Sequence, residues 1–398
     1  MNKERLFTRS YVCIMVANFL LYFGFWTLIP VLPFYLTDEY GCRAGVIGIV
    51  LSSYTVSALC VRPFSGYLMD SFPRKPIYLF CYFLFTSVFV GYMLSGVLTL
   101  FILLRVIHGT AFGGVTVGGN TLVVDIMPSA RRGEGLGYYG LTNNSAMALG
   151  PMAGLFMHGH FFYNTIFLVA FVSSFTGFLA ASLVQTKTRP PVKRNPVSLD
   201  RFVLLKGIPV SIALLLLSIP YGATTNFVAM YAKEIGLDVP TGFFFTLMAV
   251  GMGISRIFSG RQVDHGYITQ CIHYGYYPVI TAFLLLGSCR FILSVDTGTT
   301  VAVFYLVPLL LGIGFGIMFP AMNSLYINLA PNDMRATATG TYLTAWDVGI
   351  GVGIVCSGII AEWFTFYMVY LLGAMLCLVS FLYFSRYVTP HYRRNALR

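Results

Sequence analysis

Two segments of the chain share one pattern: an apolar run ends in an arginine, a glycine follows four residues later, and an aspartate follows after four more. The copies are Arg62–Asp70 and Arg256–Asp264, and the differences 256 − 62, 260 − 66 and 264 − 70 all equal 194. A second set recurs at an offset of 203, where Asn120, Pro128 and Gly137 return as Asn323, Pro331 and Gly340. Internal symmetry of this kind predicts a chain that folds as two copies of one helical bundle.

Apolar runs make up most of the sequence. Hydrophobic residues are 57% of the chain and charged residues only 10%, whereas soluble domains are about a quarter charged. A helix needs about 20 apolar residues to cross a bilayer, and twelve such runs begin near Tyr11, Ala44, Ile77, Thr99, Leu136, Phe162, Gly207, Phe243, Tyr276, Thr300, Ala338 and Phe364. We therefore predict an all-α integral membrane protein, with twelve transmembrane helices in two pseudo-symmetric six-helix bundles. The bundles are residues 1–184 and 207–398, and residues 185–206 form a cytoplasmic linker.

The positive charges lie in alternate loops. The net charge is +11, but 19 of the 25 lysine and arginine residues fall on one side of the predicted bundles. The positive-inside rule assigns that side to the cytoplasm, so we expect a multi-pass protein of the cytoplasmic (inner) membrane with both termini inside. The partner of the charge is then the lipid bilayer and not a nucleic acid. The eight cysteines show no CxxC spacing, and no metal site is expected.

The loop after the second run carries a family resemblance. Residues Gly66–Lys75 read Gly-Tyr-Leu-Met-Asp-Ser-Phe-Pro-Arg-Lys, which resembles the signature loop of the major facilitator superfamily. Pro73 stands where a glycine is usual, and Gly260–Gly266 resembles a degenerate second copy. The resemblance covers the whole chain. It implies a twelve-helix transporter that works by alternating access, acts as a monomer, has no enzymatic activity and needs no cofactor beyond an ion gradient.

The signature also implies a conformational latch. Gly66 allows close helix approach, and Asp70 is suited to accept hydrogen bonds from a helix N-terminus, where the helix dipole favours an anion. In the superfamily that terminus belongs to the eleventh helix, here near residues 336–340, and Arg74 pairs with an acid that corresponds to Asp125. The second copy adds two latch residues, Gly260 and Asp264. The alternative is that all of these are ordinary loop charges.

A second resemblance concerns the direction of transport. The stretch Ile29–Leu36 is similar to the proline-spaced segment of twelve-helix drug/proton antiporters. Ala146–Gly154 resembles their fifth-helix signature, although Ala146 stands where a glycine is expected. We predict a helix bend at Gly150, Pro151 and Gly154, because proline removes a backbone hydrogen bond and glycine permits close packing. In this interpretation the glycines slide against the other half of the protein. The alternative is a purely structural role.

Charges inside the bilayer are costly, and so they are functional candidates. Arg105 matches the superfamily's fourth-helix arginine, and His108 lies one turn along on the same face. Asp347 falls ten residues into the eleventh run, about 15 Å at 1.5 Å per residue, which is near the midplane. We predict that Asp347, His108 and Arg105 couple transport to protons. For Asp347 the alternatives are a fixed counter-charge for Arg105 or contact with a cationic substrate.

The first run lacks the carboxylate that multidrug antiporters place there, but it holds polar and aromatic residues at helical spacing. Together with residues from other runs they predict a substrate cavity lined by amides and aromatic rings, or alternatively a set of helix–helix hydrogen bonds. The candidates are Asn18, Tyr22, Trp26, Asn120, Asn143, Asn144, Tyr221, Thr225, Asn226, Asn323, Tyr342 and Trp346. Three glycines, at positions 312, 314 and 316, are expected to pack helices and not to bind a nucleotide.

These observations predict a secondary active transporter for a small organic molecule, with proton-coupled efflux as the leading function and the proton gradient as its energy source. An uptake permease for a sugar, an organic acid or a similar nutrient is the alternative, with Arg105 and His108 recognising an anion. A third class is an integral-membrane enzyme, which requires paired catalytic groups at membrane depth. Asp347 has no obvious partner acid for such a role.

Overall fold

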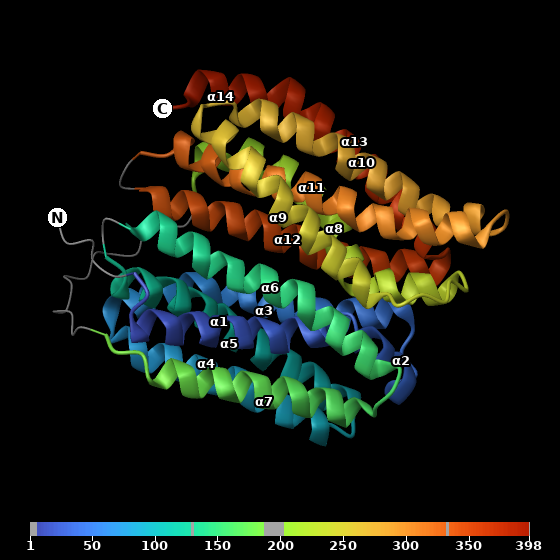
Figure 1. Cartoon of the computed structure of the whole chain (residues 1–398), viewed down its shortest axis with the longest axis horizontal. Helices are drawn as coiled ribbons and strands as arrows, with labels where there is room; N and C mark the ends of the chain where they lie inside the picture. The colour runs from blue at the N-terminus through green and yellow to red at the C-terminus, as the bar shows by residue number, and fades with distance from the viewer. Residues whose placement is uncertain (1–5, 129–130, 187–202, 332–333, 398) are drawn as a thin grey trace. The chain divides into compact units, whose positions relative to one another are not determined.

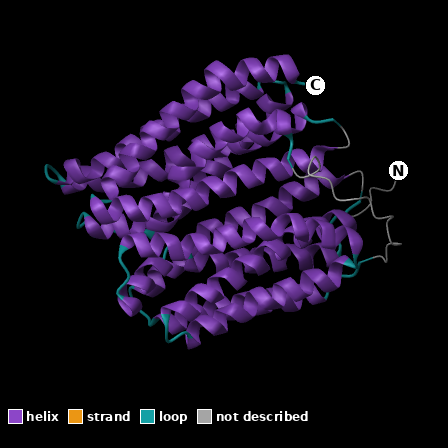
Figure 2. Cartoon of the chain, turned by 180° about the vertical axis from the view of Figure 1, so that it is seen from behind, coloured by secondary structure: helices purple, strands orange, loops and turns teal. Residues whose placement is uncertain are grey.

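The computed structural model describes residues 6–128, 131–186, 203–331 and 334–397. In these ranges the chain is helical and contains no strand, as Figure 2 shows. The predicted all-α class is therefore confirmed. Several helical residues are described by their backbone alone, and these include four of the predicted latch residues: Gly66, Asp70, Gly260 and Asp264.

The chain divides into two compact units. Unit 1 comprises Met1–Gly41 and Ser53–Asn195, and unit 2 comprises Cys42–Ser52 and Pro196–Arg398. The boundary at Asn195 falls inside the predicted linker. Figure 1 labels the helices before it: α1 (Arg9–Leu28), α2 (Leu32–Tyr40), α3 (Ala44–Ser71), α4 (Arg74–Leu94), α5 (Leu98–Ile126), α6 (Arg132–His158) and α7 (Tyr163–Ser182). The first turns of α3 belong to unit 2.

The helices after the boundary repeat the same scheme. They are the 3-10 turn η3 (Leu205–Gly207), α8 (Ile208–Glu234), α9 (Gly242–Asp264), α10 (Ile268–Leu293), α11 (Thr297–Leu329), α12 (Arg335–Trp363), α13 (Phe366–Tyr383), the π-helix η5 (Phe384–Val388) and α14 (Thr389–Asn395). In unit 1, α1 packs on α6 and α7, and α4 packs on α5 and α7. In unit 2, α8 packs on α12 and α13, and α10 packs on α11 and α13. The two units are thus built on one pairing scheme.

Ten helices of the described ranges are long and apolar enough to cross a membrane. Two of the twelve long helices fall short of that measure. The apolar stretch of α9 is the shorter segment Gly242–Arg256, and α6 includes the polar run Thr142–Ser145 and several glycines. Both still occupy the positions of predicted runs, because packing on apolar neighbours compensates for a helix that is itself less apolar.

The first apolar run forms two helices, where the sequence predicted one that continues to Leu36. α1 ends at Leu28 and α2 begins at Leu32. The physical reason is proline: Pro30 cannot donate a backbone hydrogen bond, and its ring clashes with the preceding turn of a helix. Pro33 lies in the first turn of α2, where its missing N–H costs nothing.

Glycines form a close seam between two helices in each unit. In unit 2, a Cβ at Gly312 would collide with the carbonyl oxygen of Met248, and one at Gly316 with the Ser255 hydroxyl, so α11 lies against the backbone of α9. In unit 1, a Cβ at Gly113 would lie 2.8 Å from the Ala58 carbonyl oxygen, so α5 lies against α3 in the same way. The expectation that the Gly312–Gly316 segment packs helices is confirmed.

The end of the chain folds back on unit 2, which the sequence did not predict. Nε2 of His391 in α14 lies 2.9 Å from the carbonyl oxygen of Lys206. Asn328 at the end of α11 donates from Nδ2 to the Tyr392 hydroxyl at 3.0 Å. These contacts hold α14 against the ends of η3 and α11.

Candidate transport site

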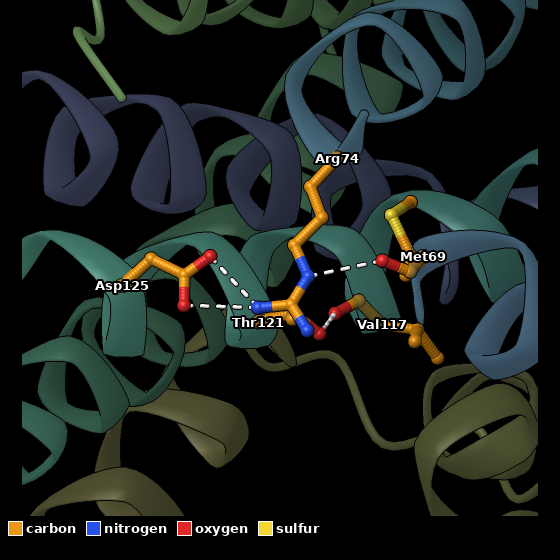
Figure 3. A network of polar contacts seen from close by, with 5 residues as sticks. All are labelled: Met69, Arg74, Val117, Thr121 and Asp125. Carbon is orange, nitrogen blue, oxygen red and sulfur yellow. Dashed lines mark hydrogen bonds and ion pairs between the residues drawn. The ribbon is translucent and has the colours of Figure 1, made fainter. Parts of the chain in front are cut away.

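An ion pair joins the start of α4 to the end of α5 (Figure 3). Nη1 of Arg74 donates to both carboxylate oxygens of Asp125, at 2.9 and 2.8 Å, and Nε donates to the carbonyl oxygen of Met69 at 3.0 Å. The two side chains are only 18% and 14% exposed. The pair that the sequence predicts is therefore present inside unit 1, partly shielded from solvent. A charge-assisted contact of this kind is among the stronger polar interactions in proteins.

The other predicted latch residues cannot be placed in the same way. For Gly66, Asp70, Gly260 and Asp264 the structure describes only the helical backbone. Their role in a latch stays a prediction that rests on the signature spacing.

Arg105 and His108 of α5 are both buried, at 3% and 2% exposure, and Tyr92 of α4 joins them. The arginine donates a hydrogen bond to the Tyr92 hydroxyl, and that hydroxyl lies 2.9 Å from Nδ1 of His108. Because an arginine can only donate, the hydroxyl proton is left for Nδ1. This arrangement favours the histidine tautomer that has its proton on Nε2.

Aromatic rings enclose this polar chain. The guanidinium carbon of Arg105 lies 4.5 Å above the centre of the Tyr54 ring, and the His108 ring lies 4.3 Å from that of Phe85. Among the described residues, Nε2 of His108 is buried and has no hydrogen-bond partner. The structure thus brings the two predicted residues together through Tyr92, which the sequence analysis did not single out.

Asp347 lies deep in α12. It is 12 residues from the start of the helix (347 − 335) and 16 from its end (363 − 347), and its side chain is half-buried beside the half-buried Trp346. Other acids in described helices, such as Asp125 and Glu234, lie within the last two residues of theirs. Within the described ranges, no three His, Cys, Asp or Glu side chains cluster as a metal site requires.

Several predicted cavity residues use their polar groups within unit 1. Asn18 donates from Nδ2 to the Thr142 hydroxyl at 2.6 Å, and Trp26 donates from Nε1 to Oδ1 of Asn143 at 3.2 Å. Both bonds run from α1 to α6. The helix–helix alternative therefore accounts for these contacts at Asn18, Trp26 and Asn143.

In α8, two more candidates bond their own helix. The Thr225 hydroxyl donates to the carbonyl oxygen of Tyr221 at 3.2 Å, and Nδ2 of Asn226 donates to that of Gly222 at 3.0 Å. Thr225 and Asn226 are also buried. The Thr225 hydroxyl and Nδ2 of Asn226 are consequently occupied in this structure.

Other candidates keep polar atoms that are not engaged within the described residues. Nδ2 of Asn144 and Oδ1 of Asn323 are buried without a hydrogen-bond partner there, whereas Asn120 is exposed. An unpaired buried amide atom costs free energy. Asn144 and Asn323 are therefore the amides best placed to bind a ligand.

The antiporter-like segment of α6 packs inside its own unit. A Cβ at Gly150 would lie 2.7 Å from Cβ of Trp26, and one at Gly154 would collide with the carbonyl oxygen of Thr27. Both glycines therefore let α6 approach α1. These contacts fit the structural alternative, and sliding against the other half stays a prediction. Pro151 lies within α6, as predicted.

Two arginines of the repeat were not among the predicted site residues. Arg62 in α3 and Arg256 in α9 are both half-buried. Arg62 has the hydroxyls of Tyr22 and Tyr54 as electrostatic neighbours, and Arg256 has those of Tyr221 and Tyr342 as its neighbours. The offset of 194 was the signal that could have identified them, since each arginine begins one copy of the repeated pattern.

Two units with one helix-pairing scheme, spanning helices, and charged side chains buried among them define a duplicated multi-pass membrane transporter. The family model of the Major Facilitator Superfamily matches residues 14–354, and the chain belongs to that family.

Two relatives from Staphylococcus aureus align over most of the sequence. The staphylopine export protein is 22% identical over 86% of this chain and 87% of its own length. The quinolone resistance protein NorA is 25% identical over 85% of this chain and 87% of its own length. Among solved structures, a POT family transporter in complex with 5-aminolevulinic acid superposes with a TM-score of 0.82 at 13% identity, covering 96% of each chain. That likeness concerns the fold.

Proposed function

We propose that this protein exports a small organic compound in exchange for protons. The observation that supports the proposal most directly is Asp347, a half-buried carboxyl group 12 residues inside α12. Burial favours the protonated form of a carboxyl group, so protons taken up and released there drive the transport cycle. The names of two relatives, which describe export of staphylopine and resistance to quinolones, support the outward direction.

The Arg74–Asp125 pair takes part in the conformational change under this proposal. It fixes the start of α4 on the end of α5, and one of the two transport states retains it. A ligand shifts such an equilibrium only through its differential affinity for the two states. Arg105 and His108, joined by Tyr92, also take part in the coupling to protons. The protein works as a monomer in the inner membrane, with both termini in the cytoplasm and no cofactor.

Transport in proteoliposomes with an imposed pH gradient tests the exchange. A mixture of metabolites and drugs is offered, and its movement is followed by mass spectrometry for the wild type and Asp347→Asn. We expect a compound to move against its gradient only when protons flow the other way, and the variant to lose that coupling. Coupling that persists in Asp347→Asn contradicts the proton site.

The matched control is Asp296→Asn. The Asp296 carboxylate caps α11 by accepting a hydrogen bond from the Thr299 backbone N–H at 2.6 Å, and hydrogen bonds to Thr299 lower its pKa. Asparagine is also a good N-cap residue, so this substitution removes an acid of unit 2 and keeps the helix. We expect unchanged coupling.

Uptake of an anionic nutrient is the second candidate. It is favoured by one observation: the Arg105–Tyr92–His108 chain offers a cation and a ring N–H in the same place. Accumulation of an organic acid in the direction of proton flow, lost in Arg105→Gln, supports this candidate over export.

A further inference from the structure

Arg256 is a cation inside the predicted membrane helix α9. Its electrostatic neighbours among the described residues are neutral. Its side chain is half-buried in α9, and among the described residues its Nε is buried without a hydrogen-bond partner. The electrostatic neighbours of the guanidinium are the hydroxyls of Tyr221 and Tyr342. A charged group at membrane depth is costly unless something compensates it. Two phenol groups do not neutralise an arginine, so this position suits an anionic group.

Aromatic rings of α8, α11 and α12 cluster beside this cation. We call the four rings of Tyr221, Phe315, Phe319 and Trp346 the aromatic box. Tyr221 stands edge-on to Phe315, with ring centres 5.0 Å apart at 79°, and lies 4.9 Å from Trp346. Phe319 lies 4.5 Å from Trp346 at 83°. Phe319 and Trp346 are half-buried, whereas Tyr221 and Phe315 are buried.

The glycine seam of unit 2 holds the cation at the level of the box. A Cβ at Gly316 would collide with Ser255, the residue before Arg256, so α9 and α11 touch where the cation and Phe315 lie. One turn beyond Phe319, Oδ1 of Asn323 is a buried acceptor without a hydrogen-bond partner among the described residues. A cation, a free acceptor and a set of rings are therefore gathered on neighbouring turns.

Unit 1 repeats the arrangement. Tyr22 stands edge-on to Phe112 at 5.8 Å and 89°, and Tyr22 is an electrostatic neighbour of Arg62. The offsets to unit 2 are 221 − 22 = 199 for the tyrosine, 315 − 112 = 203 for the phenylalanine and 256 − 62 = 194 for the arginine. Packing alone does not require an arginine at membrane depth, and both copies keep one. Its retention points to a use in each copy.

We infer that unit 2 binds the acidic group of an aromatic organic acid, with the carboxylate on Arg256 and the ring against the half-buried side of the aromatic box. This inference rests on the proposed transport function and names its substrate class. The planar fork of a guanidinium matches a carboxylate with two parallel N–H donors. Aromatic rings favour the edge-on and offset contacts that the box offers. Asn323 accepts a hydrogen bond from a hydroxyl or amine elsewhere on the molecule.

Equilibrium binding to the purified full-length protein tests this, because binding needs no gradient and is measured whether or not protons are exchanged. Three probes share one ring and differ in the head group: 3-phenylpropionate, its neutral amide 3-phenylpropanamide, and the cationic 3-phenylpropylamine. Isothermal titration calorimetry in detergent gives the three dissociation constants. We expect the acid to bind about tenfold more tightly than the amide, which corresponds to about 1.4 kcal/mol, and the amine to bind most weakly.

Substitutions assign the preference to Arg256. Arg256→Gln is expected to make the acid and the amide bind equally well, and Arg256→Lys to keep part of the preference, which shows that the site still folds. The matched control is Arg290→Gln, since Arg290 also lies over a tyrosine of unit 2, 4.9 Å from the ring centre of Tyr367, but outside the box. It is expected to keep the full preference.

Three results overturn the inference: a preference for the acid that survives in Arg256→Gln, tighter binding of the amine, or no binding of any probe up to its solubility limit. A failure of proton exchange in proteoliposomes, with the head-group preference intact, contradicts the proposed export and leaves the binding site standing.

Discussion

The hydroxyl of Tyr92 occupies an unusual position between two nitrogen groups that both need a partner. It accepts from Arg105 and lies 2.9 Å from Nδ1 of His108, and all three side chains are almost fully buried. In a low-dielectric interior, a polar atom that loses its partner pays its full desolvation cost. The orientation of the histidine therefore depends on this oxygen atom, which also helps to compensate the burial of the arginine.

Replacing Tyr92 with phenylalanine is expected to destabilise the protein. Removal of one oxygen leaves Arg105 and His108 buried with fewer partners, and such a loss costs about 1–3 kcal/mol. The measurement is thermal unfolding of the purified protein in detergent, where we expect a lower melting temperature for Tyr92→Phe.

Tyr370→Phe is the matched control for this change. Tyr370 is also fully buried, but its hydroxyl has no hydrogen-bond partner among the described residues. Its removal is expected to leave the melting temperature unchanged or slightly higher. Equal losses in the two variants contradict the role given to the Tyr92 hydroxyl.

Single residues were predictable where a spacing or a family pattern marks them. The pair Arg74 and Asp125 followed from the signature, and the depth of Asp347 followed from its place in an apolar run. Tyr92 was not predictable, because the sequence holds 26 tyrosines and nothing local shows which of them faces a histidine on the next helix. The same holds for Trp26 and Asn143, which meet across a separation of 117 residues.

At the scale of the helix, the seams at α3–α5 and α9–α11 depend on absent side chains. Gly109 and Gly113 in α5 correspond to Gly312 and Gly316 in α11 at the offset of 203 (312 − 109 and 316 − 113). Each of the four would place a Cβ against the neighbouring helix. Without a hydrophobic driving force between helices in lipid, close backbone approach is a main source of association.

Gly312→Val is therefore expected to force α11 away from α9. The added Cβ would meet the carbonyl oxygen of Met248 and lie 2.9 Å from the backbone nitrogen of Met252, neither of which can rotate aside. Overpacking of this kind costs about 1–3 kcal/mol. Thermal unfolding in detergent should show a clear decrease in melting temperature.

A glycine of the other helix in this seam serves as control. Gly253 in α9 has nothing within 4 Å of the place its Cβ would take. Gly253→Ala should be neutral or slightly stabilising, since alanine is the better helix former by about 0.5–1 kcal/mol. A Gly312 variant as stable as Gly253→Ala would mean that the seam adapts without cost.

The existence of the long helices was predictable and their ends were less so. Twelve runs correspond to twelve long helices of the described ranges, because apolar length is the dominant signal in a bilayer. The break between Leu28 and Leu32 depends on two prolines whose effect the apolar pattern conceals. The docking of α14 depends on contacts with Lys206 and Asn328, far from it in sequence.

At the scale of the whole molecule, the chain is two units with one pairing scheme, and the boundary between Asn195 and Pro196 lies in a polar segment. We expect residues 1–195 and 196–398, produced as two polypeptides in the same cell, to restore transport, because each polypeptide holds most of one compact unit and compact units fold as units. Only Cys42–Ser52 of unit 2 lies on the first polypeptide. Each polypeptide alone should give none. The assay is the proteoliposome measurement applied to the co-purified halves.

The control for this experiment is a chain divided inside a helix. A chain divided between Phe112 and Gly113 interrupts α5 within its seam, and we expect no transport from that pair. If both divisions restore transport equally, the boundary between the units does not determine where the chain can be divided.

The glycine seams also limit which parts of each unit can move. Two helices whose backbones touch have no side-chain layer in which to slip, so α9 and α11 behave as one stiff rod, as do α3 and α5 from Tyr54 onward. Spectroscopic labels placed on α9 and α11 should therefore keep a constant spacing through the transport cycle. Flexing within a unit is therefore expected between helices other than these two pairs.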